Sequence, residues 1–364
     1  MRLALLSHHR IVPGEGVSEK LLRTARCWRT LGHEADLLEL PTGGLIDPAE
    51  ATSGLAAEPP PRFRLGWIAR HQSWFARAAR ILQSRRPDAI FVRQGLWCPA
   101  FERLVKSIPA YFEINSDPVR ELKHRSSLAS AYWQATWPRL ARHARGFVAV
   151  TSELVPRGHE PDSIVIGNSI EVPSDPPRRN PPSDRPTLAM PIGSPSPWHG
   201  IDHAIEIARR IPEARVLLIG ATAIAAPPNV EFMPRVSEPE LRALLETCHA
   251  GLASLAIARA GLREACPLKS RTMLAAGLPI AYGYVDPDLP DETPFAIRLD
   301  IERDGLEVAA DAVRSLLQRA AADPTLGLDA WRFACEHLDL RAKERRRLEF
   351  IESCTRSRRP AGPS

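Results

Sequence analysis

Lysine, paired cysteines and long apolar runs are scarce in this sequence. Only five of its 48 basic residues are lysines, and its six cysteines lie scattered, without the spacing of zinc sites or redox motifs. We therefore expect a reducing, cytoplasmic environment. No apolar run approaches the ~18 residues that cross a bilayer. The apolar stretch within residues 1–7 is too short for a signal peptide and instead predicts a first β-strand.

Motifs for nucleic acid, dinucleotides and metals are missing or incomplete. No nucleic-acid-binding motif accompanies the net charge of +5, so phosphorylated substrates and membrane surfaces are the anionic partners that remain. The Gly-Glu-Gly run at 14–16 lacks the third glycine and the trailing acid of a dinucleotide fingerprint, which leaves an oxidoreductase as a weak alternative. The Asp-Pro-Asp run at 286–288 lies in a proline-rich turn, and we expect no metal there.

The length of 364 residues exceeds the ~100–200 residues of one domain, so two domains are expected. A polar, proline-rich stretch at residues 171–186 lies near the midpoint and is the predicted linker. Residues 1–170 then form an N-terminal domain, and residues 187–340 form a C-terminal domain.

Each half alternates short apolar runs with amphipathic helical patterns, which is typical of a parallel sheet covered by helices. Strands are expected in the first half at residues 3–7, 35–38, 89–93, 110–114, 147–150 and 163–166. In the second half they are expected at residues 187–192, 215–219, 230–233, 250–255, 279–282 and 296–299. Helices are expected at residues 18–31, 62–86, 201–210 and 238–248. The pattern predicts an α/β protein of two doubly wound domains facing across a cleft, with ligands beyond the carboxyl ends of the strands.

The stretch at 261–280 is the most specific in the chain. An apolar strand leads into a charged loop, and Pro267 fits the first turn of the helix that follows. Lys269 and Arg271 lie near the start of this helix, where free backbone N–H groups also attract an anion. Together these features indicate a diphosphate site. A packed helix with a solvated cationic face is an equal alternative.

This stretch resembles the donor site of retaining glycosyltransferases of family 4, which have the GT-B fold of two facing Rossmann-like domains. The family hallmark is two glutamates separated by seven residues, ahead of an Ala-Ala-Gly-x-Pro run. Glu264 matches the first glutamate, whereas Thr272 occupies the second position and offers a hydroxyl in place of a carboxylate. The resemblance implies that Glu264 approaches the donor sugar or its phosphate, and that the second position holds the nucleotide ribose. It also implies that Lys269, in a Pro-Leu-Lys run found in one branch, meets the phosphates. It places further residues in donor binding: Arg263, Cys266, Pro267, Leu268, Arg271 and Thr272.

Further matches extend the resemblance over most of the chain. Residues 192–202 resemble the first strand, loop and helix of the donor domain. The donor-binding positions in this segment are Gly193, Ser194, His199 and Gly200. Many relatives carry Gly-Arg and Lys-Gly there, and this chain lacks those two basic residues. Lys269 and the arginines beside it would therefore have to balance the phosphate charge. The resemblance also implies that residues 341–364 cross back to the first domain.

Polar residues end one strand of the first half at Glu113 and Asn115. Many relatives carry a His-Asp pair there that touches the transferred sugar, so both residues are candidate sugar contacts. A buried strand end with a capping side chain is the alternative. Gly14 and Gly16 are candidates for an acceptor-side loop, with a flexible connection as an equal alternative. The histidine pair at 8–9 is a weaker candidate.

The sequence thus predicts a metal-independent glycosyltransferase that moves a sugar from a nucleotide-sugar to a glycan, a lipid-linked glycan or a small molecule, with retention. Its catalytic candidates are Glu264, Lys269, Glu113 and Asn115. The nucleotide-sugar is a substrate, so no cofactor is expected. The alternative is a non-catalytic GT-B-like binding protein with a degenerate donor site.

Polysaccharide biosynthesis in the cytoplasm is the setting that the resemblance implies. The basic amphipathic pattern at 62–86 is compatible with peripheral contact at the inner face of an anionic membrane. A crossover helix packed on its own sheet is the favoured interpretation of that pattern.

Overall fold

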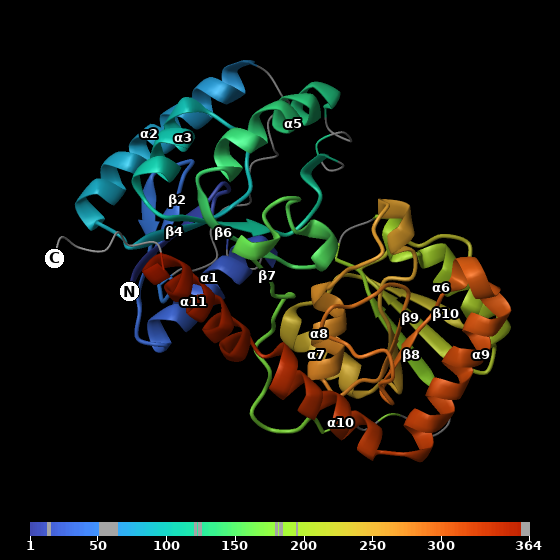
Figure 1. Ribbon diagram of the computed structural model, residues 1–364. Coiled ribbons are helices and arrows are strands. Elements are labelled where there is room, and N and C mark those ends of the chain that lie inside the picture. The colour runs from blue at the N-terminus through green and yellow to red at the C-terminus, as the bar shows by residue number, and fades with distance from the viewer. Residues whose placement is uncertain are drawn as a thin grey trace. The chain divides into compact units, whose positions relative to one another are not determined.

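The computed structural model describes residues 1–12, 16–50, 65–119, 122, 126–178, 181, 185–193 and 196–357. The chain divides into two compact units, the first made of Met1–Ile166 with Glu344–Ser364 and the second of Gly167–Lys343. Each unit is built around one sheet with helices on its faces (Figure 1). The division falls after Ile166, so the predicted linker at 171–186 belongs to the second unit.

The first unit holds a seven-stranded sheet with the order β3-β2-β1-β4-β5-β6-β7. Its strands are β1 (Arg2–Ser7), β2 (Glu34–Glu39), β3 (Gly44–Ile46), β4 (Ala89–Arg93), β5 (Ala110–Ile114), β6 (Ala144–Ala149) and β7 (Ser163–Val165). All pairs are parallel except that of β3, which runs antiparallel to β2 at one edge. The central strands are buried and mostly apolar because helices cover both faces of the sheet.

Two groups of helices bury the two faces of this sheet. The unit contains α1 (Gly16–Thr30), α2 (Leu65–Arg85), α3 (Pro99–Ser107), α5 (Ser127–Ala141), the part of α11 (Leu340–Ser357) from Glu344 onward, and the short 3-10 turns η1 (Ser152–Leu154) and η2 (Glu160–Asp162). Side chains of α2, α3 and α5 share a core with Ala4 and Leu6, whereas those of α1 and α11 share a core with Leu3 and Leu5. Because side chains alternate along a strand, these cores lie on opposite faces.

The predicted return of the chain to the first unit takes place along α11. The residues from Glu344 onward belong to the first unit. There, the Tyr111 hydroxyl donates to the Ile351 carbonyl at 2.9 Å. Trp28 donates from its indole nitrogen to the Glu344 carboxylate at 2.7 Å. The C-terminal helix is therefore part of the core of the first unit.

The second unit holds a six-stranded sheet with the order β10-β9-β8-β11-β12-β13. Its strands are β8 (Thr187–Pro191), β9 (Arg215–Ile219), β10 (Val230–Met233), β11 (Ala250–Leu252), β12 (Ile280–Tyr282) and β13 (Ala296–Arg298), and all pairs are parallel. This is the strand order of the dinucleotide-binding fold, whose ligands bind where the order reverses. In this chain that point lies between β8 and β11.

The second unit contains five α-helices within the described residues, and α7 begins at a conventional capping signal. They are α6 (Ile201–Arg210), α7 (Glu238–Glu246), α8 (Leu268–Ala275), α9 (Ile301–Ala322) and α10 (Thr325–Phe333), with the 3-10 turns η3 (Pro197–His199) and η4 (Ile257–Ala260) and a π-helical turn (Ala334–Leu338). Ser237 and Glu240 form a capping box at the start of α7. Pro267 is predicted in the first turn of α8, but it is the N-cap, and the helix itself begins at Leu268. Within the described ranges, every helix is too short or too polar to span a lipid bilayer.

Candidate functional site

The switch point of the second sheet brings the loop after β8 against the segment after β11. Gly200 has a φ of 71°, and a Cβ at this position would lie 2.9 Å from the Leu255 Cβ. The amides of Leu255 and Ala256 donate to the carbonyls of His199 and Trp198 at 3.0 and 3.2 Å. The left-handed, close-packed position explains why glycine precedes α6.

His199, Ser254 and Lys269 meet at this point. The Lys269 amine lies 2.8 Å from His199 Nδ1, and the Ser254 hydroxyl lies 3.3 Å from the same nitrogen. An ammonium group can only donate, so the charged form of Lys269 requires a lone pair on Nδ1 and leaves the histidine proton on Nε2. His199 is only 8% exposed, which holds the ring in place.

Lys269 is a partly buried basic side chain whose amine contacts a histidine ring. Burial lowers its pKa from 10.5 to about 7, and no carboxylate of the described part of the chain forms an ion pair with it. An anion bound beside the amine would offset the cost of burial and restore the charge. The first N–H groups of α8 have no partner one turn back, and they add partial positive charge at the same end. This end of the second sheet is thus suited to a negatively charged group.

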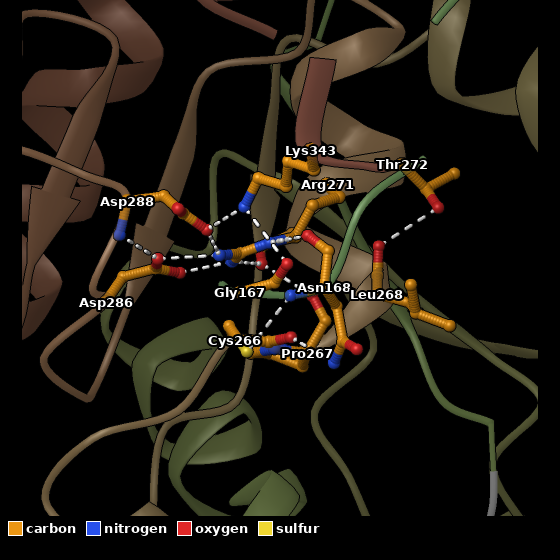
Figure 2. A network of polar contacts seen from close by, with 11 residues as sticks. Gly167, Asn168, Cys266, Pro267, Leu268, Arg271, Thr272, Asp286, Asp288 and Lys343 are labelled. Carbon is orange, nitrogen blue, oxygen red and sulfur yellow. Dashed lines mark hydrogen bonds and ion pairs between the residues drawn. The ribbon is translucent and has the colours of Figure 1, made fainter. Parts of the chain in front are cut away.

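Arg271 does not belong to this anion site, and its predicted role at the phosphates is wrong. Its side chain is fully buried, where it pairs with Asp286 and Asp288 (Figure 2). Close attraction to these carboxylates outweighs the effect of burial and holds the pKa of Arg271 well above its usual value. The guanidinium points away from solvent because it serves as the counter-ion of the two acids.

The other predicted donor residues of this stretch have differing surroundings. Glu264 pairs through its backbone with Val285, which follows β12, so it lies at the carboxyl edge of the sheet. The Thr272 hydroxyl donates to the Leu268 carbonyl of its own helix at 3.1 Å. Arg263 and Leu268 are exposed. Glu264, Arg263 and Leu268 thus stay candidates, whereas Thr272 makes the bond of an ordinary helical threonine.

Cys266 and Pro267 support the turn rather than offering reactive groups. Burial raises the pKa of the Cys266 thiol, and its sulfur accepts a hydrogen bond from the Asn168 amide at 3.4 Å. The Pro267 carbonyl accepts from Ser270 at 2.8 Å. Gly193 is exposed, and a Cβ added there would meet no described atom within 4 Å, whereas Ser194 and Gly14 lie outside the described residues.

A second polar group lies at the carboxyl end of β5 in the first unit. Lys20 of α1 contacts Glu113 at 2.8 Å and Asn115 at 3.2 Å, and Asn115 donates to Glu113 at 2.8 Å. Burial alone would raise the pKa of Glu113, but Lys20, Arg347 and Arg93 together lower it to about 2.

These contacts restrict what the first-unit residues can do. Glu113 stays ionised at neutral pH and is 2% exposed, so it cannot act as a proton-transferring group there. Asn115 is partly exposed, and Gly16 begins α1. His8 contacts the Arg93 carbonyl at 3.1 Å, and burial lowers its pKa to about 4, so the ring is neutral.

Sequence reasoning missed the partners that decide these roles. Ser254 and Lys20 come from segments without a recognised motif, and the sequence separates Lys20 from Glu113 by 93 residues. The signal available in the sequence was position alone: Ser254 lies near the end of a predicted strand, and Lys20 lies in the helix that follows the first predicted strand. No group of three or more His, Cys, Asp or Glu residues in the described ranges could hold a metal ion.

Solved structures match this architecture over nearly its whole length. Sucrose-phosphate synthase from Thermosynechococcus elongatus matches with a TM-score of 0.67 at 14% identity, covering 98% of this chain and 99% of that chain. A glycosyltransferase from Rickettsia africae ESF-5 matches with a TM-score of 0.67 at 12% identity, covering 97% of this chain and 98% of that chain. The chain has the GT-B fold.

Another GT-B match carries a nucleotide-sugar. Anabaena HepE in complex with UDP-glucose has a TM-score of 0.62 at 14% identity, covering 97% of this chain and 100% of that chain. The sequence matches no family model and no curated protein sequence. The likeness is therefore one of fold.

Proposed function

We propose that this protein is a retaining glycosyltransferase of family 4 that transfers a sugar from a nucleotide-sugar to a glycan, a lipid-linked glycan or a small molecule without a metal ion. The observation that carries the proposal is the partly buried amine of Lys269 at the switch point of the second sheet, which pairs with no carboxylate of the described residues. The GT-B fold and the glycosyltransferase neighbours support it.

The chemical demand of the reaction fits this amine. Breaking the bond between a sugar and a nucleoside diphosphate leaves negative charge on the departing phosphate. A cation that is already in place stabilises that charge without reorganisation. Lys269 supplies the charge, His199 orients the amine through Nδ1, and the N–H groups at the start of α8 contribute partial charges. Glu264, at the same sheet edge, contacts sugar hydroxyl groups in this proposal.

Calorimetry with UDP-, GDP- and ADP-linked sugars tests the proposal on the wild type and on Lys269→Ala. We expect one nucleotide class to bind to the wild type, and we expect the variant to bind it ~10²-fold or more weakly because a charged hydrogen bond is lost. Lys106→Ala is the matched control, since this lysine pairs with Glu102 on the surface of the first unit. Equal binding by wild type and Lys269→Ala would refute the proposed site.

A non-catalytic binding protein is the second candidate function, and Thr272 is the observation that favours it. This residue replaces the acid that the family carries, and its hydroxyl is directed to its own helix. Such a protein would bind a nucleotide-sugar or glycan without consuming it. To separate an enzyme from a binding protein, the protein is incubated with the preferred nucleotide-sugar and an acceptor, and the nucleotide is analysed by chromatography. Only an enzyme releases nucleoside diphosphate when the acceptor is added. NMR of the product anomeric proton tests retention.

We further propose that α2 allows peripheral contact with an anionic membrane. Residues 59–87 contain no Asp or Glu, and Arg70, Arg80 and Arg86 are exposed along or just after α2. Exposed arginines attract anionic lipid at low ionic strength. Sedimentation with phosphatidylglycerol vesicles should exceed that with phosphatidylcholine vesicles, and the triple Arg→Gln variant should abolish the difference. Equal sedimentation of the wild type with both vesicles would exclude this contact.

A further inference from the structure

Every N–H group of the Arg271 side chain has a partner (Figure 2). One terminal nitrogen donates to Asp286 and to the Ser270 hydroxyl, and the other donates to Asp286 at 2.7 Å and Asp288 at 2.6 Å. The remaining N–H donates to the Asn168 carbonyl at 3.3 Å. All five donors of a guanidinium are thus used in one planar arrangement.

Two of these partners also hold the turn that leads into α8. The Asn168 side chain donates to the Cys266 carbonyl at 2.9 Å, and its backbone amide donates to the Cys266 sulfur at 3.4 Å. The Ser270 hydroxyl donates to the Pro267 carbonyl at 2.8 Å. Lys269 lies inside this fixed segment. The backbone on both sides of it is therefore tied to the group that surrounds Arg271.

The charges around Arg271 balance one another. We call Arg271, Asp286, Asp288 and Lys343 the Arg271 cluster. Lys343 donates to Asp288 at 2.6 Å and to the Gly167 carbonyl at 3.1 Å. Burial disfavours the charge of Asp288, but Arg271 and Lys343 outweigh it and hold the pKa of Asp288 below its usual value. A cluster of two acids and two bases has no charge left over for a ligand.

Gly167 and Lys343 are the first and last residues of the second unit. A Cβ on Gly167 would collide with the Asp288 carboxylate, so only glycine permits this packing. The cluster therefore anchors both ends of the unit to the same point as α8. A scaffold fixed at this many points resists displacement of the turn.

We propose that Arg271 is a positioning residue for Lys269. Through Asn168 and Ser270 it fixes the backbone at 266–269, and this keeps the Lys269 amine beside His199. The importance of Lys269 rests on the proposed function, but the geometry inferred here does not depend on any reaction. Arg271 itself touches no substrate in this account.

The pKa of the Lys269 amine in Asn168→Ala tests the inference, read from the pH dependence of lysine Cε NMR signals. The sequence contains only five lysines, so each signal can be assigned by substitution. Asn168→Ala removes the side-chain link to Cys266 and leaves the Arg271 cluster intact. We expect the pKa of Lys269 to move from about 7 in the wild type toward 10.5 as the turn loosens and water enters.

Asn229→Ala is the matched control because Asn229 also ties buried backbone together in the second unit. Its side chain donates to the carbonyls of Ala208, Ile211 and Ala214, and it is 5% exposed. We expect a similar loss of melting temperature but an unchanged pKa of Lys269. An unchanged pKa in Asn168→Ala, or an equal shift in both variants, would overturn the inference.

Arg271→Lys gives a second measurement in the same assay. It keeps the positive charge but offers three donors at one point, so the link to Asn168 is lost. The pKa of Lys269 should rise as in Asn168→Ala. If the pKa of Lys269 responds as expected while no nucleotide-sugar binds to the wild type, the positioning role stands and the proposed function fails. If the wild type binds a nucleotide-sugar while the pKa does not respond, the positioning role fails and the proposed function stands.

Discussion

Lys269 and Arg271 lie two residues apart on α8, yet their surroundings are opposite. Arg271 is fully buried and meets two carboxylates, so its charge is neutralised inside the protein. Lys269 is partly buried but meets the ring of His199 and no carboxylate of the described ranges. The comparison shows that the missing counter-ion, and not the basic side chain, distinguishes a candidate binding cation from a structural one.

Lys20 in the first unit also contrasts with Lys269, because it has a carboxylate partner. Lys20 lies at the carboxyl end of a sheet, as Lys269 does, but it pairs with the buried Glu113 at 2.8 Å. An internal carboxylate therefore fills the position that an external anion would take. We infer that the two sheet ends serve different purposes, with anion binding in the second unit.

Removing the structural cation should cost the most. Arg271→Met removes the cation that pairs with the buried Asp286 and leaves Asp288 with Lys343, and loss of one member of a buried ion pair costs about 3–5 kcal/mol of unfolding free energy. Urea denaturation measures the loss. The surface variant Arg303→Met, whose partner Asp304 is on the same exposed turn, should cost less than about 1 kcal/mol. Similar losses of unfolding free energy for both variants would show that the buried ion pair stabilises the protein no more than the surface pair does.

Glu113→Gln should destabilise the first unit by about 2–3 kcal/mol at pH 7. The pKa of Glu113 is about 2 in the folded protein, below its unfolded value, so its stabilisation is present above pH ~4.3 and is lost as the pH falls toward 2. Denaturant titrations of wild type and variant at pH 7 and pH 3 measure the difference. If the difference in unfolding free energy between wild type and Glu113→Gln does not narrow at pH 3, Glu113 is not an ionised partner of Lys20.

Lys269→Met should stabilise the protein, unlike the two variants above. The folded pKa of Lys269 is about 7, below the unfolded value near 10.4, so the cost of its burial is full below pH 7 and disappears as the pH rises toward 10.4. We expect a gain of roughly 1–3 kcal/mol at pH 6.5 that shrinks at pH 9.5. Thermal or urea unfolding at both pH values checks the sign. A loss of stability at pH 6.5 would show that Lys269 is a structural cation like Arg271.

The smallest expected effect is the pH dependence of nucleotide-sugar binding. A bound diphosphate favours the protonated amine, so binding above pH 7 takes up a proton and weakens up to tenfold, about 1.4 kcal/mol, for each pH unit. The phosphates of a nucleotide-sugar do not titrate in this range, and the ring of His199 contacts the amine. Calorimetry between pH 6 and 9 measures the slope. A flat profile would assign the phosphate contact to another group.

The sequence predicted the fold well because apolar runs and breaker residues are local signals. The structure confirms the expected bounds of β4, β5, β9, β10 and α6. The edge strand β3 was missed because it has only three residues and no buried run. Pairing with β2 holds it in place, and that contact is not local in sequence.

The candidate site was harder to predict because it depends on counter-ions. Nothing within the first turn of α8 tells Lys269 from Arg271, and the acids that neutralise Arg271 lie 15 and 17 residues further along the chain. Their Asp-Pro-Asp run has the form of a metal motif, whereas in the structure both aspartates face cations. Burial and pairing are tertiary properties, so residue type alone could not settle these roles.

The pKa of the Lys269 amine in the wild type, measured by lysine Cε NMR with and without the nucleotide-sugar that binds best in calorimetry, tests the account most directly. The account predicts a value of about 7 for the free protein and a rise toward 10 or above in the complex. A value near 10.5 in both states would mean that the amine is solvated or already neutralised, and the assignment of an anion site to this end of the second sheet would be wrong.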